Sequence, residues 1–188
     1  MRETTDTRTR IQEIALRLFT EQGYEATSLR EIAEALGVTK AALYYHFKTK
    51  DDIIASLSEE RQAAIERLVK WAQDQPRTIE TRREFVRRYA EELFGSHHQA
   101  FMRFMERNQT ALRENPKVGK MRDLMVSMIG VLWDEGDPVT KRLRSSMALF
   151  ALHGAVFVLN DDKISDEERK EAALQVAMEL IEPRPGEA

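Results

Sequence analysis

Residues 39–46, with the sequence TKAALYYH, gather hydroxyl, ammonium and aromatic groups on one short segment. Leu43 and Phe47 are four residues apart, so on a helix they share one face, which we expect to be buried. Lys40 and Tyr45 then lie mainly on the outer faces. Such a helix can enter the major groove of DNA, because side chains near its N-terminus reach base edges and its hydroxyl groups reach phosphates. These residues predict contact with duplex DNA. On spacing alone, the alternative is an ordinary pair of packed helices with surface tyrosines.

The elements around this segment have the spacing of a helix-turn-helix. Ser28 and Glu31 form the capping-box pattern that begins one helix, and Gly37 is a typical residue to end it. Thr39 is a cap residue for the short helix that follows. A long helix over about residues 51–74 comes next. The spacing therefore predicts two helices joined by a turn of three to four residues, followed by a long helix.

The stretch TSLREIAEALGVTKAALYYHFKTKDDI, residues 27–53, resembles the DNA-binding signature of the TetR family of bacterial transcriptional regulators. The matching pieces are a helix started by Thr and Ser, the string IAEALGV, the block LYYHF and a lysine two residues before the acidic start of the fourth helix. The resemblance implies an all-α chain of about nine helices, with an N-terminal three-helix DNA-binding domain and a C-terminal helical domain for ligand binding and dimerisation. It also implies a homodimer that binds a palindromic double-stranded DNA operator, usually as a repressor. A small apolar or aromatic effector is then expected to release this dimer from the operator.

The resemblance also assigns roles to residues in the first fifty positions. Residues expected to face bases are Lys40, Ala41, Ala42 and Tyr44, with Arg30 aimed at a base or a phosphate. Residues expected to contact phosphates are Thr27, Ser28, Thr39, Tyr45, His46 and Lys50. Arg8 and Arg10 are further candidates for the DNA backbone, although basic residues near helix ends also serve solubility. Alanine offers only methyl contacts, to thymine for example, so we expect specificity to depend on Lys40, Arg30, Tyr44 and DNA shape.

Apolar residues farther along the chain repeat at a helical period. They predict helices over about residues 78–95, 97–112, 116–134, 138–160 and 165–182. Asn115 and Asp137 each precede a proline, which predicts a cap residue followed by proline at the first helical position. Ser165 and Glu168 form a second capping-box pattern. We expect a DNA-binding domain over residues 1–48 and a ligand-binding and dimerisation domain over residues 49–188.

The second domain is rich in large apolar side chains and methionine, which suits irregular or adaptable binding surfaces. Candidates for an effector pocket are Trp71, Phe85, Tyr89, Phe101, Phe104, Met105, Met125, Met128, Trp133, Phe150, His153 and Phe157. A solid core is the alternative for each of them. Small residues that let helices approach closely favour a four-helix dimer interface. Candidates for that interface are Ser146, Phe150, Gly154, Ala173, Leu174, Ala177, Met178 and Ile181, with packing on their own core as the alternative.

Composition and missing motifs narrow the functional classes. The 188 residues include no cysteine, which excludes disulfides and a thiolate zinc site. The net charge of −3 argues against a protein coated in nucleic acid. The longest nearly charge-free run, residues 145–160, is too short to span a bilayer, and the start lacks a secretory signal, so we expect a cytoplasmic protein with no membrane partner. The sequence lacks an HExxH motif, a glycine-rich phosphate loop and a nucleophile elbow. We therefore expect no catalytic residues, no metal and no cofactor. The alternative function is an all-α protein-interaction module with a vestigial helix-turn-helix.

Overall fold

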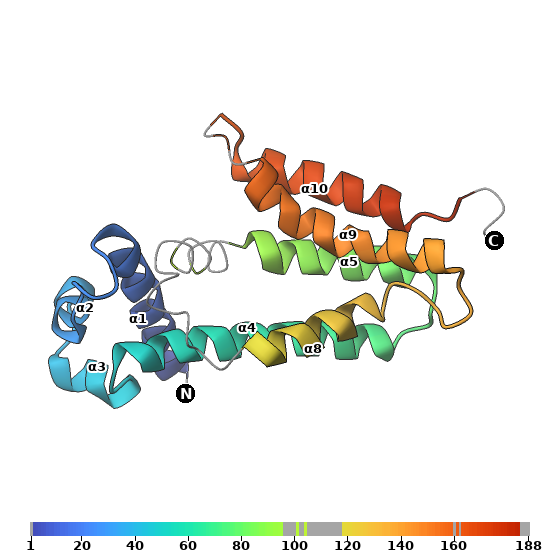
Figure 1. Cartoon of the computed structure of the whole chain (residues 1–188). Helices are drawn as coiled ribbons and strands as arrows, with labels where there is room; N and C mark the ends of the chain where they lie inside the picture. The colour runs from blue at the N-terminus through green and yellow to red at the C-terminus, as the bar shows by residue number, and fades with distance from the viewer. Residues whose placement is uncertain are drawn as a thin grey trace. The chain divides into compact units, whose positions relative to one another are not determined.

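The computed structural model describes residues 2–95, 101, 104, 118–159, 161 and 163–184, and side chains within these ranges except those of residues 2–6, 118–122 and 157. Within these residues all regular structure is helical, which confirms the predicted all-α class (Figure 1). The helices are α1 (Arg2–Glu21), α2 (Leu29–Leu36), α3 (Lys40–His46), α4 (Lys50–Gln73), α5 (Ile79–Phe94), α8 (Val118–Ile129), α9 (Val139–Val158) and α10 (Asp166–Ile181). The helix predicted over residues 97–112 lies almost entirely outside the described residues, so the total of about nine stays a prediction. No described helix is long and apolar enough to cross a membrane.

The chain forms two compact units. The first comprises residues 1–61 and 96–116, and the second comprises residues 62–95 and 117–188. Helix α4 is continuous and passes from one unit to the other. The predicted boundary between a DNA-binding domain and a ligand-binding domain, after residue 48, stays a prediction.

Local capping fixes most of the helix starts that the sequence predicts. The Ser28 hydroxyl accepts from the Glu31 backbone N–H at 3.2 Å, and the Glu31 carboxylate accepts from the Ser28 N–H at 2.7 Å. The same two-way pattern begins α10 at Ser165 and Glu168. At the start of α3, the Thr39 hydroxyl accepts from the Ala42 N–H at 3.1 Å. These caps confirm the predicted starts.

One predicted helix start and one predicted helix end are wrong. Pro138 occupies the cap position of α9 rather than its first helical position. The Asp137 carboxylate instead accepts from the Asp134 N–H at 2.9 Å and from Lys141 at 2.7 Å, so it closes the preceding turn. Helix α8 ends at Ile129, five residues before the predicted end, because the chain tightens there into bonds such as Val131 N–H to Met128 O at 3.1 Å. The predicted start at Asn115 lies outside the described residues.

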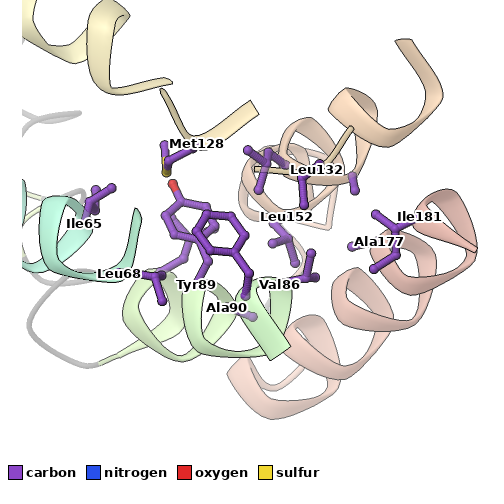
Figure 2. Close-up of a cluster of buried hydrophobic side chains, with 14 of the residues drawn as sticks. Ile65, Leu68, Val86, Tyr89, Ala90, Met128, Leu132, Leu152, Ala177 and Ile181 are labelled. Carbon is purple, nitrogen blue, oxygen red and sulfur yellow. The ribbon is translucent and has the colours of Figure 1, made fainter. Parts of the chain in front are cut away.

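Each unit has its own apolar core. In the first unit the core joins one face of α1, α2, α3 and the start of α4, together with Phe101 and Phe104. In the second unit the core joins the C-terminal part of α4 with α5, α8, α9 and α10. Figure 2 shows this second core, with Tyr89 and Val86 of α5 between residues of α4, α8, α9 and α10. The second core therefore draws on helices that are far apart in the sequence.

Candidate nucleic-acid interface

The turn between α2 and α3 sets how α3 is presented. Gly37 adopts φ +73°, in the left-handed region, where a side chain is strained even though an added Cβ would meet no atom within 4 Å. Its N–H donates to Glu34 O at 3.1 Å, and the Val38 N–H donates to Ala33 O at 3.0 Å. These bonds complete the end of α2 and redirect the chain, so that Thr39 can cap α3 only three residues after α2 ends.

Helix α3 buries one face and exposes the other. Leu43 is fully buried and Phe47, its C-terminal cap residue, is 2% exposed, as the sequence predicts. Tyr44 is half-buried against the same core, whereas Tyr45 is 75% exposed. Lys40, Ala41 and Ala42 are exposed too. The exposed face is therefore the N-terminal turn plus one tyrosine, with no large aliphatic group on it.

Two contacts order the side chains of that face. The Lys40 ammonium lies 5.4 Å from the centre of the Tyr44 ring, within the range of a cation–π attraction. Tyr45 meets His46 edge to face, with ring centres 5.3 Å apart. These contacts hold a cation at the start of α3 and two rings at its end. This arrangement suits a groove-binding helix, because it offers a hydrogen-bond donor at the N-terminal tip and a hydroxyl at the edge.

Not every residue predicted to contact phosphate is presented to solvent. Thr27 is 1% exposed and its hydroxyl donates to Gly23 O at 2.9 Å, so the side chain supports the turn after α1. The hydroxyls of Ser28 and Thr39 remain at the surface, where each caps a helix. The Thr27 side chain is therefore not part of the exposed surface around α3.

The Lys50 ammonium is tied to the turn after α1. It donates to Tyr24 O at 2.6 Å and lies 4.5 Å from the centre of the Tyr24 ring. The Tyr24 hydroxyl in turn donates to Asp51. Burial, followed by that hydrogen bond to a carboxylate, raises the pKa of Tyr24 well above its ordinary value. The prediction that Lys50 contacts phosphate stays untested, and in this structure Lys50 joins the start of α4 to the turn after α1.

Lys48 is a candidate that the sequence reasoning missed. Its side chain is exposed and its ammonium donates to Tyr44 O, at the C-terminal end of α3. A cation is favourable there because the last carbonyls of a helix carry partial negative charge. Its position directly after the LYYHF block was the available signal. Lys48 places a positive charge beside the aromatic end of the exposed face.

The remaining basic candidates differ in exposure. Arg30 is 76% exposed in its side chain and pairs with Glu34 one turn along α2, at 2.7 Å. That pair is solvated, so the guanidinium can exchange Glu34 for another anion at little cost. Arg10 is exposed, whereas Arg8 is half-buried against Phe47. Arg30 and Arg10 are therefore available at the surface of the first unit, whereas Arg8 packs on Phe47 with 39% of its side chain exposed.

The predicted pocket residues do not gather in one place. Phe101 and Phe104 belong to the core of the first unit, where Phe104 packs 5.6 Å from Phe19 and 5.8 Å from Tyr24, measured between ring centres. Those in or against the core of the second unit include Trp71, Phe85, Tyr89, Met125 and Met128. Phe150 is 47% exposed and Trp133 is half-buried. Met105 and the Phe157 side chain lie outside the described residues.

Tyr89 and His153 form a polar pair at the edge of the second core. The Tyr89 hydroxyl lies 3.0 Å from His153 Nε2, and His153 Nδ1 lies 2.9 Å from Leu149 O. Because a carbonyl only accepts, Nδ1 carries the proton in the neutral ring and Nε2 accepts from the tyrosine. The pair thus satisfies a half-buried histidine, which matches the structural alternative for this residue.

A cleft lies among the described residues of the second unit, and none of its lining residues is one of those predicted to line a pocket. Its volume is about 230 Å³. It is lined by Ala72, Gln73, Arg77, Thr81, Ser127, Gly130 and Val131. Beside it, the Arg77 guanidinium donates to Asp134 and to Gly130 O at 3.2 Å. The prediction of an apolar effector pocket stays a prediction.

The residues predicted for a dimer interface differ in burial. Ala173, Ala177 and Ile181 are buried in the second core, so they pack within their own chain. Leu174 and Met178 are partly buried against it, and Ser146 and Gly154 are half-buried. The large apolar side chains exposed on α9 are Val139, Leu143, Met147, Phe150 and Val158.

The described residues contain no group of three or more His, Cys, Asp or Glu side chains that could hold a metal ion.

Comparisons with known proteins agree with the geometry of the first unit. Residues 11–57 match the family model described as bacterial regulatory proteins, tetR family. Over 57 residues the chain is 51% identical to the HTH-type transcriptional regulator AcrR of Shigella flexneri, a match that covers 30% of this chain and 26% of that protein. The chain thus spans about a quarter of that relative's length. A longer match, 24% identical over 163 residues, covers 81% of this chain and 84% of the fatty acid metabolism regulator protein of Bacillus subtilis.

Solved structures share the fold over nearly the whole chain. A transcriptional regulator of the TerR/AcrR family from Aquifex aeolicus superposes with a TM-score of 0.68 at 22% identity, covering 90% of this chain and 96% of that one. The TetR-family regulator PfmR of Thermus thermophilus gives a TM-score of 0.63 at 25% identity, covering 92% and 93%. The similarity in fold therefore extends through the second unit, where the sequence match is weak.

Proposed function

The chain belongs to the TetR family of bacterial regulatory proteins, and from that premise we propose that it is a ligand-responsive transcriptional repressor that binds a palindromic operator as a homodimer. The observation that carries the proposal is the exposed face of α3, with Lys40 at its tip and Tyr45 at its end. We place this activity in the cytoplasm, where operator DNA is accessible.

In the proposed complex α3 lies in the major groove. Lys40 reads a base edge as a donor, Ala41 and Ala42 contact thymine methyl groups, and Tyr44 and Arg30 complete the reading surface. Phosphate contacts come from surface groups around it: Ser28, Thr39, Tyr45, His46 and Lys48. Two copies of α3 about one DNA turn apart, roughly 34 Å or more, would multiply the modest discrimination of one short helix.

We propose that the two copies associate through the exposed face of α9. Its exposed apolar residues Val139, Leu143, Met147, Phe150 and Val158 follow one another at intervals of three, four or eight residues, so they form a single stripe along the helix. An added Cβ at Gly154, on the same stripe, would meet no atom within 4 Å, so a partner helix could approach closely there. A stripe of this kind suits a two-fold interface in which the same patch serves both subunits.

The proposed effector is a small apolar or aromatic molecule bound in the second unit. Two relatives carry names that fit such chemistry: the fatty acid metabolism regulator of Bacillus subtilis and the transcriptional repressor KstR2 of Rhodococcus jostii, which is 43% identical over 47 residues, 25% of this chain and 23% of its own. A solved structure of KstR2 from Mycobacterium tuberculosis is described as a ketosteroid transcriptional regulator. Tyr89 and His153 are the polar groups we propose for orienting the effector.

Helix α4 is the proposed route by which the effector changes DNA binding. It runs from Lys50 to Gln73 without glycine or proline, so it can transmit a tilt along its length. Effector binding that favours one tilt would change the separation of the two α3 helices. A coupling of about 1–3 kcal/mol would change operator affinity about 5- to 150-fold.

The test is selection of bound DNA from a random duplex pool, followed by affinity measurements on the enriched sequence at several salt concentrations. We expect enriched sites with two-fold symmetry and a salt-dependent affinity. A pool that shows no enrichment and no salt-dependent binding would refute DNA recognition and favour a protein-interaction module. Enriched sites without symmetry would refute the proposed dimer arrangement alone.

A further inference from the structure

A polar network joins α1 to α4 within the first unit, and it is buried at Gln12 and Ser56 and exposed at Glu60. Gln12 is 1% exposed, and its amide donates to Ser56 Oγ at 2.9 Å and to Glu60 Oε1 at 2.8 Å. The Ser56 hydroxyl in turn donates a hydrogen bond to Ile53 O at 2.8 Å. Removing a partner from the buried part of this network would leave a polar group without a hydrogen bond, so the network fixes the register of α1 on α4.

Arg8 extends this network to the end of the recognition helix. It lies one turn before Gln12 on α1, and its Nε donates to the same Glu60 oxygen at 3.5 Å. Its guanidinium carbon lies 4.5 Å from the centre of the Phe47 ring. Phe47 is the C-terminal cap residue of α3, and its N–H donates to Leu43 O. One side chain of α1 therefore contacts both α4 and the cap residue of α3.

These contacts give Arg8 a role that does not need DNA. A planar guanidinium stacks on an aromatic ring while its N–H groups bind a carboxylate, which a lysine ammonium does less well. Glu60 carries the negative charge that keeps the guanidinium over Phe47. These contacts engage the Nε and one face of the guanidinium, while 39% of the Arg8 side chain stays exposed.

We propose that Arg8 is a positioning residue for α3, acting through Phe47 and Glu60, and not a contact to the DNA backbone. This inference rests on the proposed function, because its effect is read as operator recognition. Loss of Arg8 removes no side chain from the exposed face of α3, but it allows the C-terminal end of the helix to shift. Operator affinity then falls more than affinity for random DNA, which depends mainly on charge.

The test compares Arg8→Met, Glu60→Gln and the control Arg17→Met, on the full-length protein, with the operator obtained by selection and with random duplex. Arg17 is exposed on α1 and lies nine residues after Arg8. Nine residues are about two and a half helical turns, so Arg17 lies on the opposite face of α1 and the control removes the same charge from there. We expect Arg8→Met to lower operator affinity about five- to tenfold, while the slope of log affinity against log salt stays at the wild-type value. The ratio of operator to random affinity should fall for Arg8→Met and stay unchanged for Arg17→Met.

Glu60→Gln gives an independent test because the two roles predict opposite signs. Removing a negative charge raises DNA affinity if Glu60 has no positioning role. The same substitution lowers operator affinity if Glu60 holds Arg8 over Phe47. The double variant, Arg8→Met with Glu60→Gln, then loses no more operator affinity than the more strongly affected single variant. Retained affinity for random DNA and a wild-type circular dichroism spectrum show that the variants are folded.

The inference is overturned if Arg8→Met reduces the salt slope by about 0.9 per subunit, as loss of a phosphate contact would. It is also overturned if Glu60→Gln binds the operator as tightly as wild type or more tightly. Failure of the wild-type protein to bind any selected duplex is a different result, because it removes the proposed function itself.

Discussion

Replacing Gly37 by alanine tests whether the turn before α3 depends on backbone conformation alone. The φ of +73° lies in the left-handed region, where a non-glycine residue costs about 1–2 kcal/mol, with asparagine among the better tolerated. An added Cβ would meet no atom within 4 Å, so no steric clash adds to that cost. The hydrogen bonds of the Gly37 and Val38 N–H groups to the end of α2 remain possible. We therefore expect Gly37→Ala to lower the free energy of unfolding by about 1–2 kcal/mol, and Gly37→Asn to lower it by less.

The measurement is thermal unfolding followed by far-UV circular dichroism, because both tryptophans lie in the second unit and would report poorly on this turn. A loss of 1 kcal/mol should lower the midpoint by about 2–8 °C. Gly136→Ala is the matched control: Gly136 has no left-handed φ and the same open space, so the substitution should be neutral or stabilise by up to about 1 kcal/mol. Equal midpoints for Gly37→Ala and Gly136→Ala, or a larger loss for asparagine than for alanine, would refute the backbone explanation.

Three further predictions concern two lysines of the first unit, the acid stability of that unit and the proposed dimer. Lys48→Met should reduce the salt slope of operator binding by about 0.9 per subunit, whereas Lys50→Met, which removes an ammonium bound to Tyr24 O, should mainly lower the unfolding midpoint. The reverse pattern would exchange their roles. The hydrogen bond from the Ser28 side chain holds the pKa of Glu31 below its ordinary value, so its stabilising contribution is present above the unfolded-state pKa and is lost as pH falls through the folded-state pKa. Unfolding midpoints should therefore decline below about pH 5, and less steeply for Glu31→Gln; parallel curves would contradict this. Phe150→Asp should convert the dimer to a monomer in sedimentation, whereas Val126→Asp, at an exposed valine on α8, should not; a dimeric Phe150→Asp would refute the α9 interface.

The sequence could specify the helix starts and the exposed face of α3 because those features depend on neighbours along the chain. The capping pairs at Ser28 and Ser165 join residues three apart, and the four-residue spacing of Leu43 and Phe47 assigns one face to the core. The prediction at Asp137 failed for a related reason. A carboxylate there has both a helix and a turn within reach, and the turn at Asp134 takes it.

Only the tertiary structure decided which basic and hydroxyl groups are available to DNA. Thr27 bonds to Gly23 O inside the first unit, Lys50 to Tyr24 O, and Arg8 to Glu60, which is 52 residues away in the sequence. Likewise, helical periodicity marked Ala177 as apolar but could not tell its own core from a partner's surface. A side chain's type and spacing determine which contacts it can make, whereas its partners across long separations depend on how the helices pack.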